Sequence, residues 1–156
     1  MPLVDPALSL KILGNGPESE KLKILVSKSG LNERVHFYDS KKGKDLLKMI
    51  SEAHAVIVPS QWPENMPLSL LESMAMGKTV IVANSGGMPE RIINGQNGFI
   101  FEAGSANDLA EKINHLKDYD LERMGEKAKE SIRDFSPENH YKELMAIYID
   151  KIKNKC

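Results

Sequence analysis

Short runs of β-branched and apolar residues alternate along the chain with longer segments whose apolar positions recur at helical spacing. The run from Ala55 to Val58 is apolar at every position, which is typical of a parallel strand covered on both faces. The pattern predicts strands over residues 8–13, 34–38, 55–58, 79–83 and 98–101. It predicts helices over residues 17–29, 44–52, 67–76, 89–93, 106–116, 121–133 and 137–152.

Strands and helices that take turns along a chain are joined by right-handed crossovers, which place the strands in an open parallel sheet. We therefore expect an α/β fold with an open parallel sheet and helices on both faces. No strand separates the segment 121–133 from the segment 137–152, so these two helices are expected to form an appendage. The sequence contains no internal repeat, low-complexity tract or linker, and residues 1–156 are interpreted as a single domain.

Composition narrows the class of protein. A content of 41% hydrophobic and 28% charged residues is typical of a soluble globular domain. The net charge of -1 gives no field that would favour nucleic acid or an anionic membrane, and no apolar run approaches the roughly 20 residues of a membrane span. The start of the chain lacks the features of a signal peptide. The only cysteine, Cys156, cannot form an internal disulfide or a cysteine-based zinc site, so a cytoplasmic location is expected.

Three predicted strands end in loops of similar design. These loops span residues 14–17, 59–67 and 84–89, and each closes with a proline. Proline suits the first position of a helix, where a missing N–H costs nothing. In a parallel sheet the three loops emerge at the carboxyl edge, where helix N-termini present unpaired N–H groups and the positive end of a dipole. The pattern predicts a phosphate-like anionic ligand at this edge.

Two glutamates bracket the helix expected to begin at Pro67. Glu64 lies in the preceding loop, and Glu72 lies in the second turn, roughly 7–8 Å along the axis from the helix start. A phosphate on the N–H groups of Met66, Leu68 and Ser69 would have a hydroxyl acceptor on either side. This arrangement suits a diphosphate with a sugar at each end.

The opposite face of the same helix is expected to meet the core. A stripe with the right spacing is formed by Leu68, Leu71, Met74 and Ala75. A plainer interpretation of the two glutamates remains open, since glutamate is common near helix N-termini because of the dipole and is often simply solvated.

Several motifs in this order resemble those of the family 4 (group 1) retaining glycosyltransferases. They are Gly14-Asn15-Gly16-Pro17-Glu18, Pro59-Ser60, the two glutamates separated by seven residues, Ala75-Met76-Gly77-Lys78-Thr79-Val80, Ser85-Gly86-Gly87-Met88-Pro89-Glu90 and Asn97-Gly98-Phe99. The similarity runs from about Leu8 to the end of the chain. It implies the GT-B fold, two Rossmann-like halves across a cleft, with this chain as the C-terminal, donor-binding half.

The resemblance also implies roles for individual residues. Glu64 is expected to act at the reacting end, hydrogen-bonding the hydroxyls of the transferred sugar, and Glu72 to accept from the ribose hydroxyls. The backbone of Asn65, Met66, Pro67 and Leu68 is expected to contact the sugar and diphosphate, with Gly14, Gly86 and Gly87 also at the donor. The family uses no metal or other cofactor, and the donor would be a UDP- or GDP-sugar. The reaction would be retaining transfer of a hexose to a glycan or lipid, as in polysaccharide biosynthesis.

Two departures from the family pattern leave a second hypothesis open. Family members place an arginine and a lysine on the diphosphate from a first strand and loop, whereas residues 1–10 contain no Lys or Arg. We therefore expect that the domain lacks its first strand and loop and that the acceptor-binding half is absent. Family members also usually have a glycine close to the nucleotide base, after the strand that matches residues 35–38. Asp39 occupies this position here, so the resemblance does not decide which base is bound. In the first hypothesis, the chain is the donor half of a glycosyltransferase that can be membrane-peripheral, and it is inactive in isolation. In the second, it is a non-catalytic module that donates its pocket to a partner chain.

Some short segments can each be interpreted in two ways. Gly86 and Gly87 fit either a tight turn or a close approach to the diphosphate. Trp62 could stack on a ligand or form a lid over the core. Gly14-Asn15-Gly16 resembles a dinucleotide fingerprint, but Ser19 replaces the third glycine, which disfavours NAD binding. The lysines near Gly43 are interpreted as a solvated turn rather than a phosphate site.

Overall fold

The computed structural model describes residues 1–153, and Cys156 lies outside them. The strands are β1 Leu10–Leu13, β2 Val35–Tyr38, β3 Ala55–Val58, β4 Thr79–Ala83 and β5 Gly98–Phe101. The helices are α1 Ser19–Lys28, α2 Gly43–Glu52, α3 Leu68–Ala75, α4 Ala106–His115, α5 Leu121–Ser131 and α6 Pro137–Lys153, with short 3-10 helices η1 Met88–Arg91 and η2 Leu116–Asp118. Every predicted strand is confirmed.

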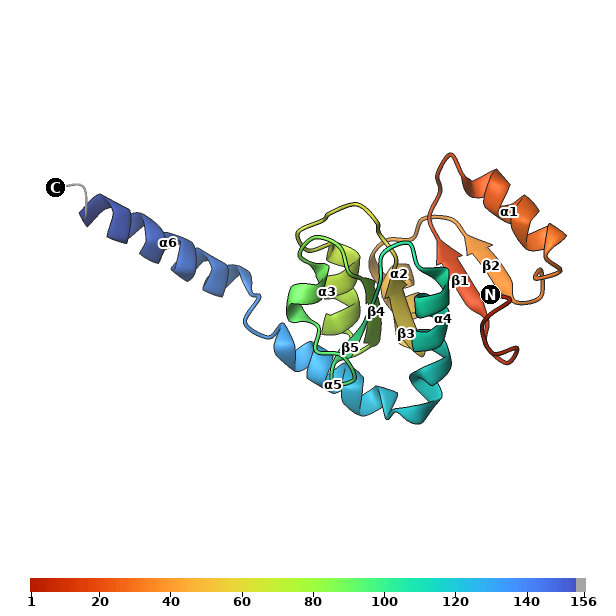
Figure 1. Ribbon diagram of the computed structural model, residues 1–156. Helices are drawn as coiled ribbons and strands as arrows, with labels where there is room; N and C mark the ends of the chain where they lie inside the picture. Colours follow the sequence, from red (N-terminus) through yellow and green to blue (C-terminus); the bar gives the residue numbers. More distant parts are fainter. Residues whose placement is uncertain (154–156) are drawn as a thin grey trace.

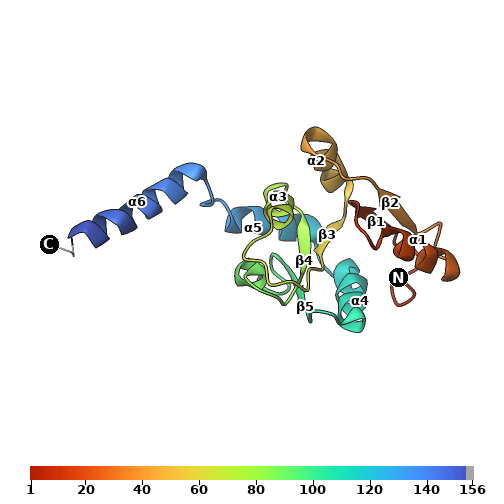
Figure 2. The ribbon, with the colours of Figure 1, turned by 90° about the horizontal axis from the view of Figure 1, so that it is seen from above.

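All paired strands are parallel, but they form two hydrogen-bonded groups. β1 pairs with β2, with Leu10 opposite Val35, and β4 pairs with β3 on one side and β5 on the other. Figures 1 and 2 show the β1–β2 pair next to β3, on the side away from β4. The α/β class and the parallel pairing are confirmed, and the described strands divide between these two hydrogen-bonded groups.

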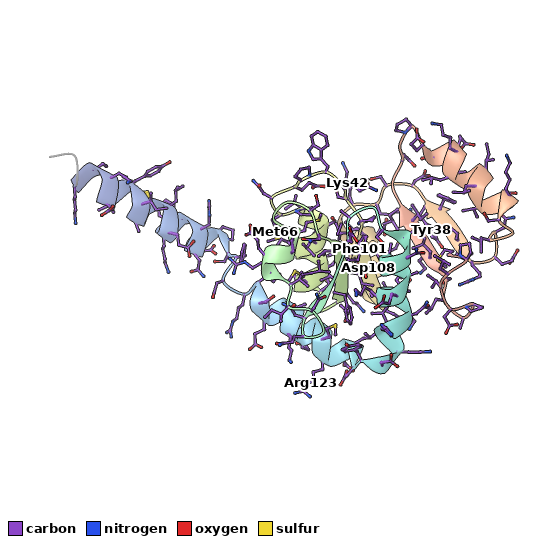
Figure 3. The ribbon with its side chains drawn as sticks, viewed as in Figure 1. Tyr38, Lys42, Met66, Phe101, Asp108 and Arg123 are labelled. Atoms are coloured by element: carbon purple, nitrogen blue, oxygen red, sulfur yellow. The ribbon has the colours of Figure 1, made fainter. Side chains whose placement is uncertain are left out.

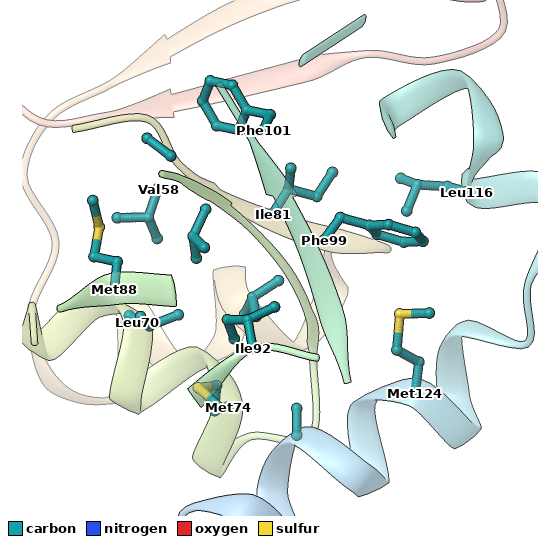
Figure 4. Packing of buried hydrophobic residues seen from close by; sticks show 14 residues of the cluster. Val58, Leu70, Met74, Ile81, Met88, Ile92, Phe99, Phe101, Leu116 and Met124 are labelled. Atoms are coloured by element: carbon teal, nitrogen blue, oxygen red, sulfur yellow. The ribbon is translucent and has the colours of Figure 1, made fainter. Parts of the chain in front are cut away.

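Helices cover both faces of the strands. Figure 2 shows α2, α3 and α5 on one face and α4 on the other. The core lies around β4, in which every residue from Thr79 to Ala83 is buried. Around it pack Leu70 and Met74 of α3 and Met124 of α5 (Figure 4). Helix α5 is therefore part of the domain, and the prediction that it joins an appendage is wrong.

Helix α6 has a different place. It has no buried residue and carries the chain away from the body of the domain (Figure 1). Its large apolar side chains, Tyr141, Ile147, Tyr148, Ile149 and Ile152, are exposed. Among the described residues, no helix is both long and apolar enough to cross a membrane.

The start of α4 is fixed by hydrogen bonds at the end of β5. Ser105 Oγ accepts the N–H of Asp108 at 3.2 Å, which caps the helix. Asp108, which is labelled in Figure 3, in turn accepts the N–H of Glu102 with its Oδ2 at 2.7 Å, and its Oδ1 lies 3.1 Å from Lys112 Nζ. These contacts favour the charged carboxylate, so the N–H of Glu102 first, and then Lys112, lower the pKa of Asp108 below its ordinary value.

Replacing Asp108 with asparagine is expected to lower stability at neutral pH. Because the folded-state pKa is lowered, the carboxylate contributes stability above its unfolded pKa of about 3.9, and that contribution is lost as pH falls through the folded value. Urea unfolding at pH 7 should thus separate the two proteins, and the separation should shrink at pH 3. An equal difference at both pH values would contradict a role for the charge.

Candidate donor site

Helix α3 begins with uncapped N–H groups. Pro67 has φ -66° and ψ 139°, so it is the extended residue that precedes the helix, and no side chain caps the helix start. Its carbonyl accepts the N–H groups of Leu70 at 3.0 Å and Leu71 at 3.3 Å. Within residues 1–153, the N–H groups of Leu68 and Ser69 have no acceptor. Such a helix end is suited to an anion.

The sequence predicted that the proline closing each of the three loops is the first residue of a helix, and this prediction is wrong for all three. Pro67 precedes α3, while α1 begins only at Ser19, two residues after Pro17. Pro89 is the second residue of η1. The physical reason at Pro67 is that its fixed φ also fits an extended residue, so the helix can begin one position later. The N–H groups left open are consequently those of Leu68 and Ser69.

Helix α3 turns a different face to the core than predicted. Leu70, Ser73 and Met74 are buried, whereas Ala75 is exposed and Leu68 is 74% exposed. The predicted stripe is therefore wrong for Leu68 and Ala75 and holds for Met74. Since residues four apart lie on the same helix face, Glu72 and Leu68 share the exposed side. Glu72 thus stands one turn beyond the uncapped helix start, on the same solvent-facing surface.

The loop that carries Glu64 is held by the loop after β4. The N–H of Gly87 donates to the carbonyl of Glu64 at 2.8 Å. A Cβ atom on Gly86 would collide with the backbone of Glu64, and one on Gly87 would collide with the carbonyl of Asn65. The two loops therefore pack backbone against backbone, and only glycine fits there.

The sequence left open whether Gly86 and Gly87 form a tight turn or approach the diphosphate, and the backbone of Gly86 decides part of this question. Gly86 has φ +57°, the left-handed region that favours glycine, so the turn interpretation is confirmed. The contact with Glu64 was not expected from the sequence, although two adjacent glycines in a loop are a signal of close backbone approach. A contact between these glycines and a diphosphate stays a prediction.

The loop of residues 59–67 is mostly open to solvent. Glu64 and Met66 are half-buried, while Asn65 is exposed. Trp62 is 77% exposed, so the interpretation of this residue as a lid over the core is wrong. Its side chain is accessible to a ligand.

The loop after β1 lies on the other strand pair. The N–H of Gly14 donates to the carbonyl of Tyr38 at 3.0 Å, and the Asn15 amide, with its nitrogen toward Asp39, donates to Oδ1 at 3.1 Å. The N–H of Gly16 donates to Ser19 Oγ at 3.0 Å. Ser19, which breaks the dinucleotide fingerprint, therefore closes this loop onto itself. No hydrogen bond found in the described part of the chain joins the loop to residues 59–67.

The candidate site is an open surface. Two hollows of the described residues lie away from it: one of about 360 Å³ lies between Leu3 and α4, and one of about 240 Å³ lies between Gln96 and α5. No group of three or more His, Cys, Asp or Glu side chains that could hold a metal ion occurs within residues 1–153.

Most of the chain matches a known protein family. The family described as "Glycosyl transferases group 1" matches residues 2–131. The chain belongs to this family. Among curated group 1 relatives, it is 32% identical over 148 residues to N-acetyl-alpha-D-glucosaminyl L-malate synthase of Bacillus anthracis, covering 93% of this chain and 38% of that protein. It is 30% identical over 159 residues to D-inositol 3-phosphate glycosyltransferase of Corynebacterium glutamicum, covering 97% and 38%.

Solved glycosyltransferase structures share the fold. The structure of Anabaena Alr3699/HepE in complex with UDP superimposes with a TM-score of 0.82 at 23% identity, over 94% of this chain and 42% of that one. A glycosyltransferase from Rickettsia africae superimposes with a TM-score of 0.81 at 26% identity, over 94% and 41%. These neighbours confirm the GT-B resemblance. The present chain spans about two-fifths of the length of such relatives.

Proposed function

We propose that this chain is the donor half of a retaining hexosyltransferase and binds a nucleotide-diphospho-sugar at the start of α3. The diphosphate would lie on the N–H groups of Leu68 and Ser69, the transferred sugar at Glu64 and the ribose at Glu72. The observation that carries the proposal is the uncapped helix start with Glu72 on its exposed face. Among the fold neighbours, Anabaena HepE has structures with UDP and with UDP-glucose, which supports a UDP-sugar as the first donor to test.

In this proposal the protein positions the reactants and stabilises charge. Negative charge develops on the diphosphate as the glycosidic bond breaks, and the open N–H groups of α3 would stabilise it without a metal or other cofactor. Glu64, fixed by the Gly87 contact, would orient the sugar hydroxyls. The leaving phosphate would help to deprotonate an acceptor hydroxyl on the same face of the sugar, which retains the anomeric configuration. The acceptor, a glycan or lipid, would be bound by a second half, in a cytoplasmic enzyme that can be membrane-peripheral.

The test is isothermal calorimetry with UDP- and GDP-sugars on the wild-type chain and Glu72→Ala. We expect the substitution to weaken binding about 10- to 100-fold, because hydrogen bonds to a charged group contribute about 1.5–3 kcal/mol. Glu122→Ala, which alters an exposed glutamate on α5, is the matched control and should leave the affinity unchanged. If Glu72→Ala bound the nucleotide sugar with the affinity of the wild type, the assigned site would be wrong.

A second function is a candidate because the chain spans about two-fifths of the length of its relatives. It is a module that binds the nucleotide sugar and performs no transfer by itself. A transfer assay on the isolated chain, with and without a candidate acceptor-binding polypeptide, separates the two. Turnover by the chain alone would eliminate the non-catalytic module.

A further inference from the structure

Trp62 is the most exposed large apolar side chain among the described residues. It is 77% exposed, although tryptophan is highly buried on average in folded proteins. Other exposed aromatic rings have partners: the guanidinium of Arg91 lies 4.7 Å from the ring centroid of Phe135, and Tyr119 meets Phe99 edge to face at 5.0 Å. The Trp62 indole has no ring contact and no hydrogen bond within the described part of the chain. The packing of the domain therefore does not account for this side chain.

The backbone on both sides of Trp62 is held in place. Before it, the carbonyl of Gln61 accepts the hydroxyl of Ser85 at 3.3 Å. After it, the backbone of Glu64 packs directly against Gly86. The next residue along the chain is a proline, which restricts the residue before it to extended conformations. Because an indole rotates about only two side-chain bonds, the loop offers a large aromatic surface that loses little conformational entropy when a ligand covers it.

The carboxylate two residues along the same loop indicates the chemistry of that ligand. A hexopyranose carries hydroxyl groups around its edge and C–H groups on its two faces. Glu64 can accept hydrogen bonds from the hydroxyls, whereas a flat aromatic ring can cover a C–H face. A diphosphate needs N–H or cationic groups instead, and the indole offers a single N–H. Trp62 and Glu64 together therefore supply the two kinds of contact that a sugar ring requires.

We propose that Trp62 is a specificity-determining residue, whose indole packs on a C–H face of the transferred hexose while Glu64 binds the hydroxyls of the same ring. The inference rests on the proposed function, because Glu64 is what brings the sugar to this loop. It adds a requirement on the substrate: the hexose must present one face without a projecting hydroxyl to the indole. The affinity that Trp62 contributes is then confined to the sugar, and the nucleoside diphosphate has no share in it.

The first test is calorimetry of each sugar nucleotide beside its own nucleoside diphosphate, UDP-glucose beside UDP and GDP-mannose beside GDP. We expect Trp62→Ala to weaken binding of the sugar nucleotide about 3- to 10-fold, the range that aromatic packing contributes, and to leave binding of the diphosphate unchanged. Trp62→Phe should recover part of the loss, because it keeps an aromatic face. Tyr141→Ala, which removes an exposed aromatic ring from α6, is the matched control and should bind as the wild type does. Urea midpoints of all three variants should match that of the wild type, since both side chains are exposed.

Fluorescence gives a second readout, which a merely structural role would not change. Trp62 is the only tryptophan in the sequence, so tryptophan emission from the full chain reports on this side chain alone. We expect a saturating sugar nucleotide to shift the emission to shorter wavelength, because the sugar excludes water from the indole. The nucleoside diphosphate alone should leave the emission unchanged.

Equal affinity of Trp62→Ala and the wild type for the sugar nucleotide would overturn the proposal. An emission shift of the same size with UDP alone would also overturn it, since the indole would then contact the nucleotide. The Glu72→Ala calorimetry separates this inference from the proposed function. If Glu72→Ala weakens binding and Trp62→Ala does not, only the role of Trp62 is wrong, whereas both are wrong if neither sugar nucleotide binds the wild-type chain.

Discussion

Replacement of Gly87 with alanine is expected to weaken nucleotide-sugar binding about tenfold or more and to destabilise the fold by about 1–3 kcal/mol. The added Cβ would collide with the carbonyl of Asn65, so the loop that carries Glu64 must move. That movement also lengthens the 2.8 Å hydrogen bond from the Gly87 N–H to Glu64. Calorimetry with a UDP-sugar measures the first effect, and urea unfolding measures the second.

Gly16→Ala is the matched control for stability. A Cβ on Gly16 meets no atom within 4 Å, and its φ is outside the left-handed region. Its unfolding free energy should stay within about 0.5 kcal/mol of the wild type. If Gly87→Ala were as harmless as Gly16→Ala, the loop after β4 would not be what fixes Glu64.

A large loss of stability is also expected from a substitution at the centre of the core. Ile81 has no exposed surface and lies in the middle strand β4, so Ile81→Ala should lower the free energy of unfolding by about 2–5 kcal/mol. The loss combines the transfer free energy of the removed groups with the cavity left among fully packed neighbours. Denaturant unfolding followed by circular dichroism measures it.

The same substitution in α1 provides the comparison. Ile24 is 54% exposed and α1 has no buried residue, so Ile24→Ala should change the free energy of unfolding by less than about 0.5 kcal/mol. A large loss at Ile24 would mean that α1 packs more tightly than its exposure indicates. Equal losses at both positions would contradict a core centred on β4.

The strands were predictable because their signal is local. The bounds of β3, β4 and β5 match the predicted ranges, since each is a short apolar run bounded by a loop. Pairing is not local, so the pattern could not reveal that β1 and β2 separate from the other three strands. The status of α5 was missed for a similar reason: this helix, in which Met124, Gly125 and Ala128 are buried, packs against β4, a strand that lies far away in the sequence.

The sequence predicted which loop and which helix form the candidate site, but it did not predict the orientation of that helix or the contact that holds the loop. The order of motifs was enough to select the loop of Glu64 and the helix of Glu72. The face that α3 turns to the core, however, is set by its packing against β3, β4 and α5, which buries Leu70 and leaves Leu68 exposed. The pairing of Gly87 with Glu64 joins loops from two strands, so no spacing within either loop could reveal it. The roles assigned to Glu64, Glu72 and the glycines in donor binding stay predictions.

The position of α6 has a practical consequence for measuring affinity. This helix has 17 residues, so it extends about 25 Å at 1.5 Å per residue, and it leads away from helix α3, which carries Glu72. Immobilising the protein on a biosensor chip through an affinity tag after this helix would keep the sensor surface clear of the candidate site. Dissociation rates of nucleotides and sugar nucleotides could then be recorded on one immobilised sample.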